Sequence, residues 1–161
     1  MRNLSISILI PVFNDQEVLP ELFQRLKALL KQYYPNHEIM FVDDGSVDNS
    51  WQIIEDLHKL DSQAKGLKLI HNFGQQNAIA AGLDNVSGDI VVIMDSDLQD
   101  RPEDIPKLID ALLANDSSMA IAKWKSRQDG FLKQFVSRLF FAVSKKITNI
   151  RHEPNLAVFR A

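Results

Sequence analysis

The chain has 161 residues, of which 45% are hydrophobic, and this length and composition suit one globular domain with a substantial core. Its formal net charge of -3 argues against a nucleic-acid-binding protein, because such proteins carry an excess of basic residues. The chain has no cysteine, so any metal must be held by oxygen or imidazole ligands. No apolar run approaches the roughly 20 residues that a membrane-spanning helix requires.

Short apolar runs alternate with segments of helical periodicity, a pattern typical of βαβ units built around a largely parallel sheet. The first half predicts, in order, a strand at 6–12, a helix whose apolar stripe covers 18–30, a strand at 38–42, a helix with a stripe over 51–57 and a short strand at 67–70. Ser46 or Asp48 can cap the second of these helices, because both side chains accept hydrogen bonds from backbone N–H groups.

The second half continues the alternation of apolar runs and helical segments. It predicts a helix over about 75–86, a strand at 90–94, a helix from Pro102 to about Asn115, a strand at 118–123, a basic amphipathic helix over 131–147 and a strand-like end at 156–161. The segment 90–94 is apolar on both faces, as expected of a central parallel strand covered by helices on both sides. The last segment has no cap or polar tail, so we expect the chain to be truncated at its C-terminus.

Acidic residues follow two of the predicted strands directly. Asp43 and Asp44 come after the second strand, and Asp95 and Asp97 come after the fourth. In open α/β sheets, ligands bind at the carboxyl edge of the strands. Both acidic groups are therefore expected to face one cleft at that edge.

A metal site is predicted within the second acidic group. If residues 95–99 stay extended, the alternation of side chains directs Asp95, Asp97 and Gln99 to one side, where they offer two carboxylates and an amide oxygen to a cation. Such ligands favour Mg2+ or Mn2+, and a site with so few protein ligands completes its shell with water and substrate phosphates. The predicted partner is therefore a diphosphate compound.

Several motifs follow one another in a characteristic order. They are Ile10-Pro11-Val12-Phe13-Asn14-Asp15, Val42-Asp43-Asp44-Gly45-Ser46 with Asp48, Asn72-Phe73-Gly74-Gln75, Gly88-Asp89, and Met94-Asp95-Ser96-Asp97-Leu98-Gln99-Asp100 followed by Pro102-Glu103. Together they make the chain resemble the family 2 glycosyltransferases, and most closely the dolichyl- and undecaprenyl-phosphate sugar synthases. The resemblance covers about residues 5–104, and the combination is far more specific than any one motif.

The resemblance implies an α/β fold of the GT-A type, with a mostly parallel central sheet and helices on both faces, in which residues 1–161 form a single catalytic domain. It implies metal-dependent, inverting transfer of a sugar from a UDP- or GDP-linked donor to an acceptor, with a polyprenyl phosphate preferred. A saccharide hydroxyl in cell-envelope polysaccharide synthesis is the alternative acceptor, and a non-catalytic nucleotide-binding module is the alternative function. The expected location is the cytoplasmic face of the membrane.

The same resemblance assigns residues to the nucleotide pocket. The expected pocket contains Pro11, Phe13, Asp15, Val42 and Asp44. Asp44 is expected to recognise the base, and Asp15 is expected to lie near the ribose or the base. Gln75 and Ser96 are placed in the same donor-binding set.

The resemblance also assigns the catalytic and metal-binding residues. Asp95 and Asp97 are expected to hold the donor phosphates through Mg2+ or Mn2+, with Gln99 completing the metal site. Arg127 is the third residue expected in the catalytic set, because the planar guanidinium of arginine is well suited to phosphate. The family usually has an arginine pair in this region, whereas this chain has Trp124 where the first arginine is expected.

The acceptor is indicated less directly by the sequence. Val158 stands where polyprenyl-phosphate synthases often carry an aspartate, but a lipid phosphate oxygen is already anionic and needs little help from a general base.

The basic helix predicted over 131–147 admits two interpretations, packing against the sheet or peripheral contact with a membrane. A phospho-receiver domain is disfavoured, because its acidic pair follows the first strand rather than the second.

Overall fold

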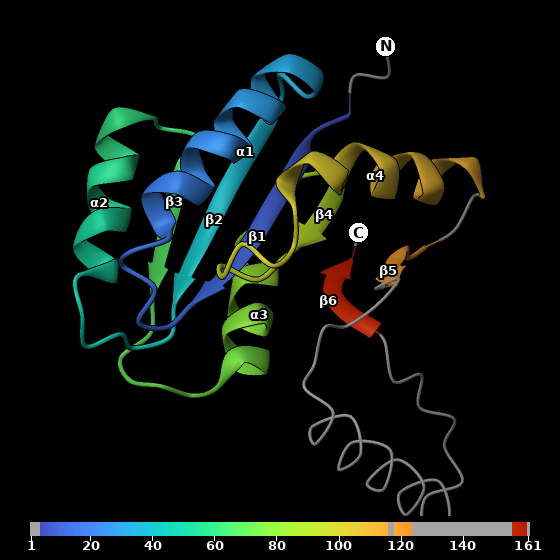
Figure 1. Ribbon diagram of the computed structural model, residues 1–161. Helices are drawn as coiled ribbons and strands as arrows, with labels where there is room; N and C mark the ends of the chain where they lie inside the picture. The colour runs from blue at the N-terminus through green and yellow to red at the C-terminus, as the bar shows by residue number, and fades with distance from the viewer. Residues whose placement is uncertain (1–3, 116–117, 124–155, 161) are drawn as a thin grey trace, which may run out of the picture.

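The computed structural model describes residues 4–115, 118–123 and 156–160, and these build a six-stranded sheet flanked by helices (Figure 1). The strands are β1 (Ile6–Val12), β2 (His37–Asp43), β3 (Ala64–Lys68), β4 (Ile90–Ile93), β5 (Ile121–Lys123) and β6 (Leu156–Arg160). Their order across the sheet is β3-β2-β1-β4-β6-β5. The pairs β3–β2, β2–β1 and β1–β4 are parallel, and β6 is antiparallel to both β4 and β5. The predicted, mostly parallel sheet is therefore confirmed.

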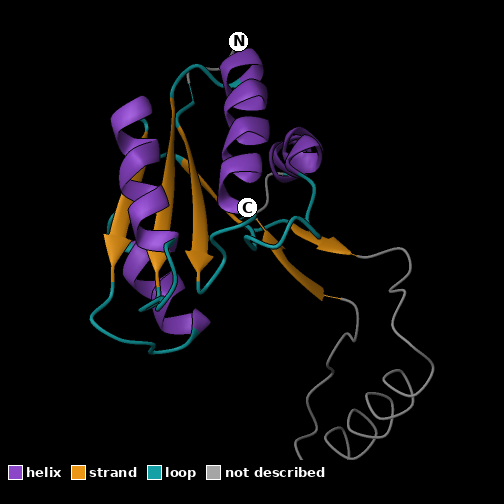
Figure 2. Cartoon of the chain, turned by 60° about the vertical axis from the view of Figure 1, so that its left-hand side comes forward, coloured by secondary structure: helices purple, strands orange, loops and turns teal. Residues whose placement is uncertain are grey.

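Helices cover both faces of the sheet, as predicted (Figure 2). They are α1 (Leu19–Tyr33), α2 (Ser50–Leu60), α3 (Gln75–Leu83) and α4 (Ile105–Ala114), with a short 3-10 helix, η1 (Pro102–Asp104), before α4. Successive residues of a strand point to opposite faces. In β1, Ile8 and Ile10 pack in the same cluster as the apolar stripes of α1, α2 and α4, whereas Leu9 packs with α3 on the other face. This arrangement explains why the central strands are apolar on both sides.

Polar side chains form hydrogen bonds with the backbone in the turn before α2. The Asp48 carboxylate accepts hydrogen bonds from the backbone N–H of Ser50 at 2.9 Å and of Gln16 at 3.1 Å. The N-cap residue of α2 is Asn49, whose side chain makes no capping hydrogen bond, so neither predicted cap occupies that position. Asp48, one residue earlier, accepts the N–H of the first helical residue, and Ser46 Oγ accepts the N–H of Asn14. One carboxylate thereby joins the start of α2 to the loop after β1.

Close packing of α3 on the sheet depends on Gly82. A Cβ atom at this position would overlap the Leu9 side chain and lie 2.9 Å from Val42 Cγ2. The hydrogen atom of glycine therefore allows the helix to approach β1 and β2 closely. The first residues of α3 are thereby held at the carboxyl edge of the strands.

The third strand differs from the prediction of 67–70. It spans Ala64–Lys68, because its register against β2 pairs Ala64 with Ile39 and Lys68 with Asp43. The apolar run that suggested the later position ends in Ile70, whose side chain is 88% exposed. β3 has one strand neighbour among the described residues, so its position is set by pairing rather than by its own hydrophobicity.

Other boundaries moved by smaller amounts. The helix expected over 75–86 ends at Leu83, and Val86 packs against the sheet from the turn that follows. β4 ends at Ile93, although the Met94 N–H still donates to Leu9 O at 3.1 Å. β5 begins at Ile121 rather than at residue 118.

The strand-like segment at the end of the sequence is confirmed as β6 and lies between β4 and β5. The helix predicted over 131–147 lies outside the described residues. Among the helices that are described, none has the length and hydrophobicity needed to cross a bilayer.

Candidate functional site

The candidate site lies at the carboxyl edge of the sheet, where β1, β2 and β4 end. β1 pairs with β2 on one side and with β4 on the other, so the direction in which strands are added reverses across β1. Such a switch point opens a crevice beyond the strand ends, which is the usual ligand site of open α/β sheets. A pocket of about 340 Å³ lies here, at the side to which the arrowheads of β1, β2 and β3 point (Figure 1).

Eight residues of the predicted site line this pocket together. They are Pro11, Phe13, Asp15, Asp44, Gln75, Asp95, Ser96 and Asp97. Val12, Asn72 and Gly74 also line it and were not assigned to the site from the sequence. Asn72 and Gly74 belong to the motif that ends in Gln75, so a signal for both was present in the sequence.

Asp15 is held tightly in the turn between β1 and α1. Its backbone N–H donates to Ser50 Oγ at 2.9 Å, and its carbonyl accepts the N–H groups of the first residues of α1. Its carboxylate oxygen Oδ2 accepts hydrogen bonds from the Phe13 N–H at 3.2 Å and from Ser96 Oγ at 2.5 Å. The side chain is therefore oriented by contacts from both β1 and the segment after β4.

The two acidic residues at the end of β2 have different roles. Asp43 is fully buried, does not line the pocket, and accepts the Ser46 N–H at 3.1 Å. Asp44 lines the pocket although it is only 3% exposed, and its two oxygens accept the N–H groups of Phe73 at 2.8 Å and Gly74 at 2.9 Å. Asp44 thus fixes the loop between β3 and α3 against the end of β2.

The loops around the pocket also contact one another. Gly45 has a φ of +73°, and a Cβ added there would lie 2.5 Å from the backbone carbonyl carbon of His71, so the loops after β2 and β3 touch. The Val47 N–H donates to Asn14 Oδ1 at 2.9 Å, which joins the loops after β1 and β2. These contacts hold the pocket in shape before any ligand binds.

The segment after β4 is a compact turn rather than the extended run that the alternation argument required. Leu98 has a φ of 61°, in the left-handed region, and the backbone bends over residues 96–100. Asp97 Oδ1 accepts the Gln99 N–H at 3.0 Å, and Asp95 Oδ1 accepts a hydrogen bond from Gln75 Nε2 at 2.6 Å. Asp95 and Asp97 still line one pocket, but a strand-like alternation is not the reason.

Asp100 closes this turn as a buried carboxyl group. Burial raises its pKa, and together with the negative charge of Asp95 and the smaller effect of Asp97 it brings the pKa to about 6, against the lowering effect of a hydrogen bond from the Asp95 backbone N–H. Negative charge is therefore concentrated at this end of the pocket. A positive ion bound there would favour the ionised form of Asp100.

The residues at this end fit a divalent cation. Asp95 and Asp97 offer carboxylate oxygens to the same pocket, which are hard ligands suited to Mg2+ or Mn2+. Within the described residues, no group of three or more carboxylate or imidazole side chains has metal-binding geometry. A cation here would therefore complete its shell with water and ligand phosphates, as the sequence predicted.

Three residues of the predicted site are not placed in the pocket. Val42 is fully buried and packs with Ala78 and Ile79 of α3 on one face of the sheet. Gln99 is exposed and does not line the pocket, so its metal-binding role remains a prediction. Arg127 lies outside the described residues, and its role also remains a prediction.

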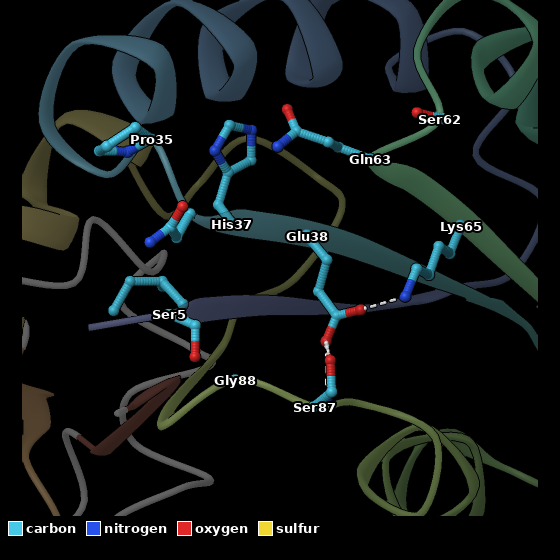
Figure 3. A pocket seen from close by; sticks show the side chains of 11 residues that line it. Ser5, Pro35, His37, Glu38, Ser62, Gln63, Lys65, Ser87 and Gly88 are labelled. Carbon is cyan, nitrogen blue, oxygen red and sulfur yellow. Dashed lines mark hydrogen bonds and ion pairs between the residues drawn. The ribbon is translucent and has the colours of Figure 1, made fainter. Parts of the chain in front are cut away.

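A second pocket, of about 370 Å³, lies at the opposite, amino edge of the strands (Figure 3). Its main charged group is Glu38, whose carboxylate accepts hydrogen bonds from Ser7 Oγ at 2.6 Å, from Lys65 Nζ at 2.6 Å and from the Ser87 N–H at 2.6 Å. Burial opposes ionisation of Glu38, but these hydrogen bonds outweigh it and lower its pKa to about 2. The network joins β1, β2, β3 and the loop before β4, so Glu38 serves the architecture of the sheet.

An open, mostly parallel sheet flanked by helices is the architecture of the GT-A glycosyltransferases, and solved structures of that class share this fold. Glucosyl-3-phosphoglycerate synthase from Mycobacterium tuberculosis in complex with UDP superposes with a TM-score of 0.66 and 22% identity, over 98% of this chain and 56% of that chain. Residues 1–349 of S. aureus TarS in complex with UDP-GlcNAc give a TM-score of 0.60 and 25% identity, over 78% of this chain and 36% of that chain.

The sequence pattern of Glycosyl transferase family 2 matches residues 7–159, and the chain belongs to this family. A curated relative, the undecaprenyl-phosphate 4-deoxy-4-formamido-L-arabinose transferase of Pseudomonas fluorescens (strain SBW25), is 40% identical over 146 residues. The match covers 90% of this chain and 42% of the relative. The chain thus spans less than half the length of that relative.

Proposed function

We propose that the chain is the donor-binding catalytic domain of an inverting, metal-dependent glycosyltransferase that transfers a sugar from a nucleoside diphosphate to a polyprenyl phosphate. The observation that carries the proposal is the meeting of two carboxylate pairs in one pocket, Asp15 with Asp44 and Asp95 with Asp97. The name of the Pseudomonas fluorescens relative supports the acceptor, and the UDP-GlcNAc complex of TarS supports the class of donor.

The side chains that line the pocket suit the two parts of such a donor. Phe13, which is 45% exposed, offers an aromatic face near the carboxylate of Asp15, a combination that suits a nucleobase and a ribose. Asp95 and Asp97 by themselves would repel a diphosphate, since all of these groups are negatively charged. Asp95 and Asp97 would hold a divalent cation that offsets this repulsion, and the cation would supply Lewis-acid stabilisation of the leaving nucleoside diphosphate.

The residues of the chain contribute mainly orientation. Gln75 holds Asp95 and Ser96 holds Asp15, so both carboxylates are oriented before the donor binds. A lipid phosphate oxygen is an anionic nucleophile, so a single in-line displacement with inversion needs no strong general base. We assign Arg127 to the acceptor phosphate or the donor diphosphate, and we place the reaction at the cytoplasmic face of the membrane, where a peripheral contact would bring the acceptor to the pocket.

Calorimetric titration tests the donor site. The chain is titrated with UDP and with GDP, each in Mn2+ and in EDTA, and the titrations are repeated with Asp97→Asn. This substitution removes the charge but keeps the oxygen that accepts the Gln99 N–H. The matched control is Asp84→Asn, an exposed residue at the far end of α3.

We expect one nucleoside diphosphate to bind in Mn2+ and to bind much more weakly in EDTA. Asp97→Asn should weaken Mn2+-dependent binding more than about tenfold, a loss typical of damaged metal sites, while Asp84→Asn should leave it unchanged. Failure of the folded chain to bind either diphosphate would contradict the proposal. If the chain binds the nucleoside diphosphate sugar but transfers no sugar to undecaprenyl phosphate or to a saccharide, the alternative of a non-catalytic nucleotide-binding module is favoured.

A further inference from the structure

Ser96 lies between the two acidic residues of the turn after β4, but its contact is with a different part of the site. Its Oγ donates to Asp15 Oδ2 at 2.5 Å, across 81 residues of sequence. Ser96 is only 6% exposed, whereas Asp97 next to it is exposed. The hydroxyl of Ser96 is therefore engaged in a hydrogen bond within the protein. Direct contact between Ser96 and the nucleoside diphosphate sugar is the weaker interpretation.

The surroundings of Asp15 show what the hydroxyl of Ser96 controls. The backbone of Asp15 is held on both sides, by Ser50 Oγ and by the N–H groups that begin α1. The remaining freedom is rotation of the side chain, and the two donors on Oδ2 restrict it. Among the residues that the structure describes, no donor is bonded to the other oxygen, Oδ1, while Asp15 itself lines the pocket.

We propose that Ser96 is a positioning residue for nucleoside recognition, which orients the carboxylate of Asp15 so that Oδ1 accepts an N–H or O–H group of the base or ribose. The inference rests on the proposed function, since it requires a nucleoside in this pocket. A carboxylate that is already oriented loses less conformational freedom on binding, and this preorganisation increases affinity. Ser96 thereby contributes to binding of the nucleoside through Asp15. Its neighbours Asp95 and Asp97 contribute to binding of the phosphates.

The test separates the nucleoside end from the metal. Binding of UMP and GMP is measured in EDTA by NMR titration, so that no metal contributes, and Mn2+ binding is measured separately without nucleotide. The variants are Ser96→Ala, Asp15→Ala and the double variant, with Ser62→Ala as a control at an exposed serine near the opposite edge of the sheet. Circular dichroism and thermal unfolding establish that each variant is folded.

We expect Ser96→Ala to weaken binding of the preferred monophosphate about two- to tenfold, the range that corresponds to the loss of one hydrogen bond. Mn2+ affinity should stay within about twofold of the wild type, and Ser62→Ala should change neither quantity. Because Ser96 acts through Asp15, its substitution should have no further effect in the Asp15→Ala background.

Two results would overturn the inference while leaving the proposed function intact. In one, Ser96→Ala binds the monophosphate as tightly as the wild type. In the other, it weakens binding by the same factor whether or not Asp15 is present, which would show that Ser96 does not act through that carboxylate. Absence of any Mn2+-dependent binding of UDP or GDP by the wild type would instead refute the proposed function, and the inference with it.

Discussion

Protonation of Glu38 should loosen the amino edge of the sheet, and Glu38→Gln should reproduce this loss at neutral pH. The ionised carboxylate accepts hydrogen bonds from Ser7, Lys65 and Ser87, which belong to β1, to β3 and to the loop before β4. The glutamine variant lacks the negative charge and presents an N–H2 group where one oxygen accepts the Lys65 ammonium. Two donors would then face each other, and at least one would lose its partner.

The size of the effect follows from the pKa. The pKa of Glu38 falls from an ordinary value of 4.5 to about 2 in the folded protein, a difference of 4.5 − 2 = 2.5. At 1.36 kcal/mol per pKa unit, this corresponds to about 3 kcal/mol of folding free energy at pH 7. The Lys65 side chain is 46% exposed, so solvent screening reduces its share, and we expect a net contribution of about 2–3 kcal/mol. Because the folded pKa is lowered, this stability is present above pH 4.5 and is lost as the pH falls towards 2.

Urea unfolding of the wild type and of Glu38→Gln over a range from about pH 7 to about pH 2.5 measures the effect. The variant should be less stable by about 2–3 kcal/mol at pH 7, and the gap should narrow below about pH 4.5 as the wild-type carboxylate takes up its proton. Glu17→Gln is the control, since Glu17 is exposed, and it should change stability by less than about 0.5 kcal/mol. A gap between the wild type and Glu38→Gln that does not vary with pH would refute the reasoning.

Two further predictions concern packing and charge near the site. Gly82→Ala should lower the free energy of urea unfolding by about 1–3 kcal/mol, because the added methyl group would overlap Leu9 and crowd Val42; an unchanged value would mean that α3 can shift without cost. Asp100→Asn in EDTA should raise stability at pH 7 by up to about 3 kcal/mol, because burial, with the charge of Asp95, raises the pKa of Asp100 from 3.8 to about 6 and so disfavours its ionised form. The folded carboxyl holds its proton more tightly than the unfolded one, so this gain should shrink as the pH falls from 6 to 4, and a gain that stays constant with pH would contradict the assignment.

The strands and helices that the sequence predicted best are those whose pattern is decided locally. The segment 90–94 is apolar at every position and forms β4 almost to the residue, and the stripe over 18–30 forms the buried face of α1. β3 was misplaced because its position depends on the register with β2, which is a contact between residues more than 20 positions apart. Local hydrophobicity carries no information on such a pairing.

Prediction of the site shows the same division. Topology alone brings the ends of parallel strands to one edge, so the clustering of Asp44 with Asp95 and Asp97 could be predicted from their places after strands. Residues 95–99 are not extended as predicted, since the backbone bends around Leu98, so side-chain alternation does not group Asp95 with Asp97. Asp95 and Asp97 lie in one pocket because both follow the end of β4, and not because the segment after β4 is extended.

The order of strands, helices and acidic motifs was enough to predict the family, because each of these features lies in a short segment that folds largely by local preference and burial. Which atoms of those motifs can act depends instead on the folded chain. Folding turned Asp43 into the interior and Asp44 to the pocket, and it joined Ser96 to Asp15 and Gln75 to Asp95. These contacts depend on the conformation of turns and on packing between distant segments. Rotation about one backbone bond can change the partner of a side chain, so only the folded chain specifies these contacts.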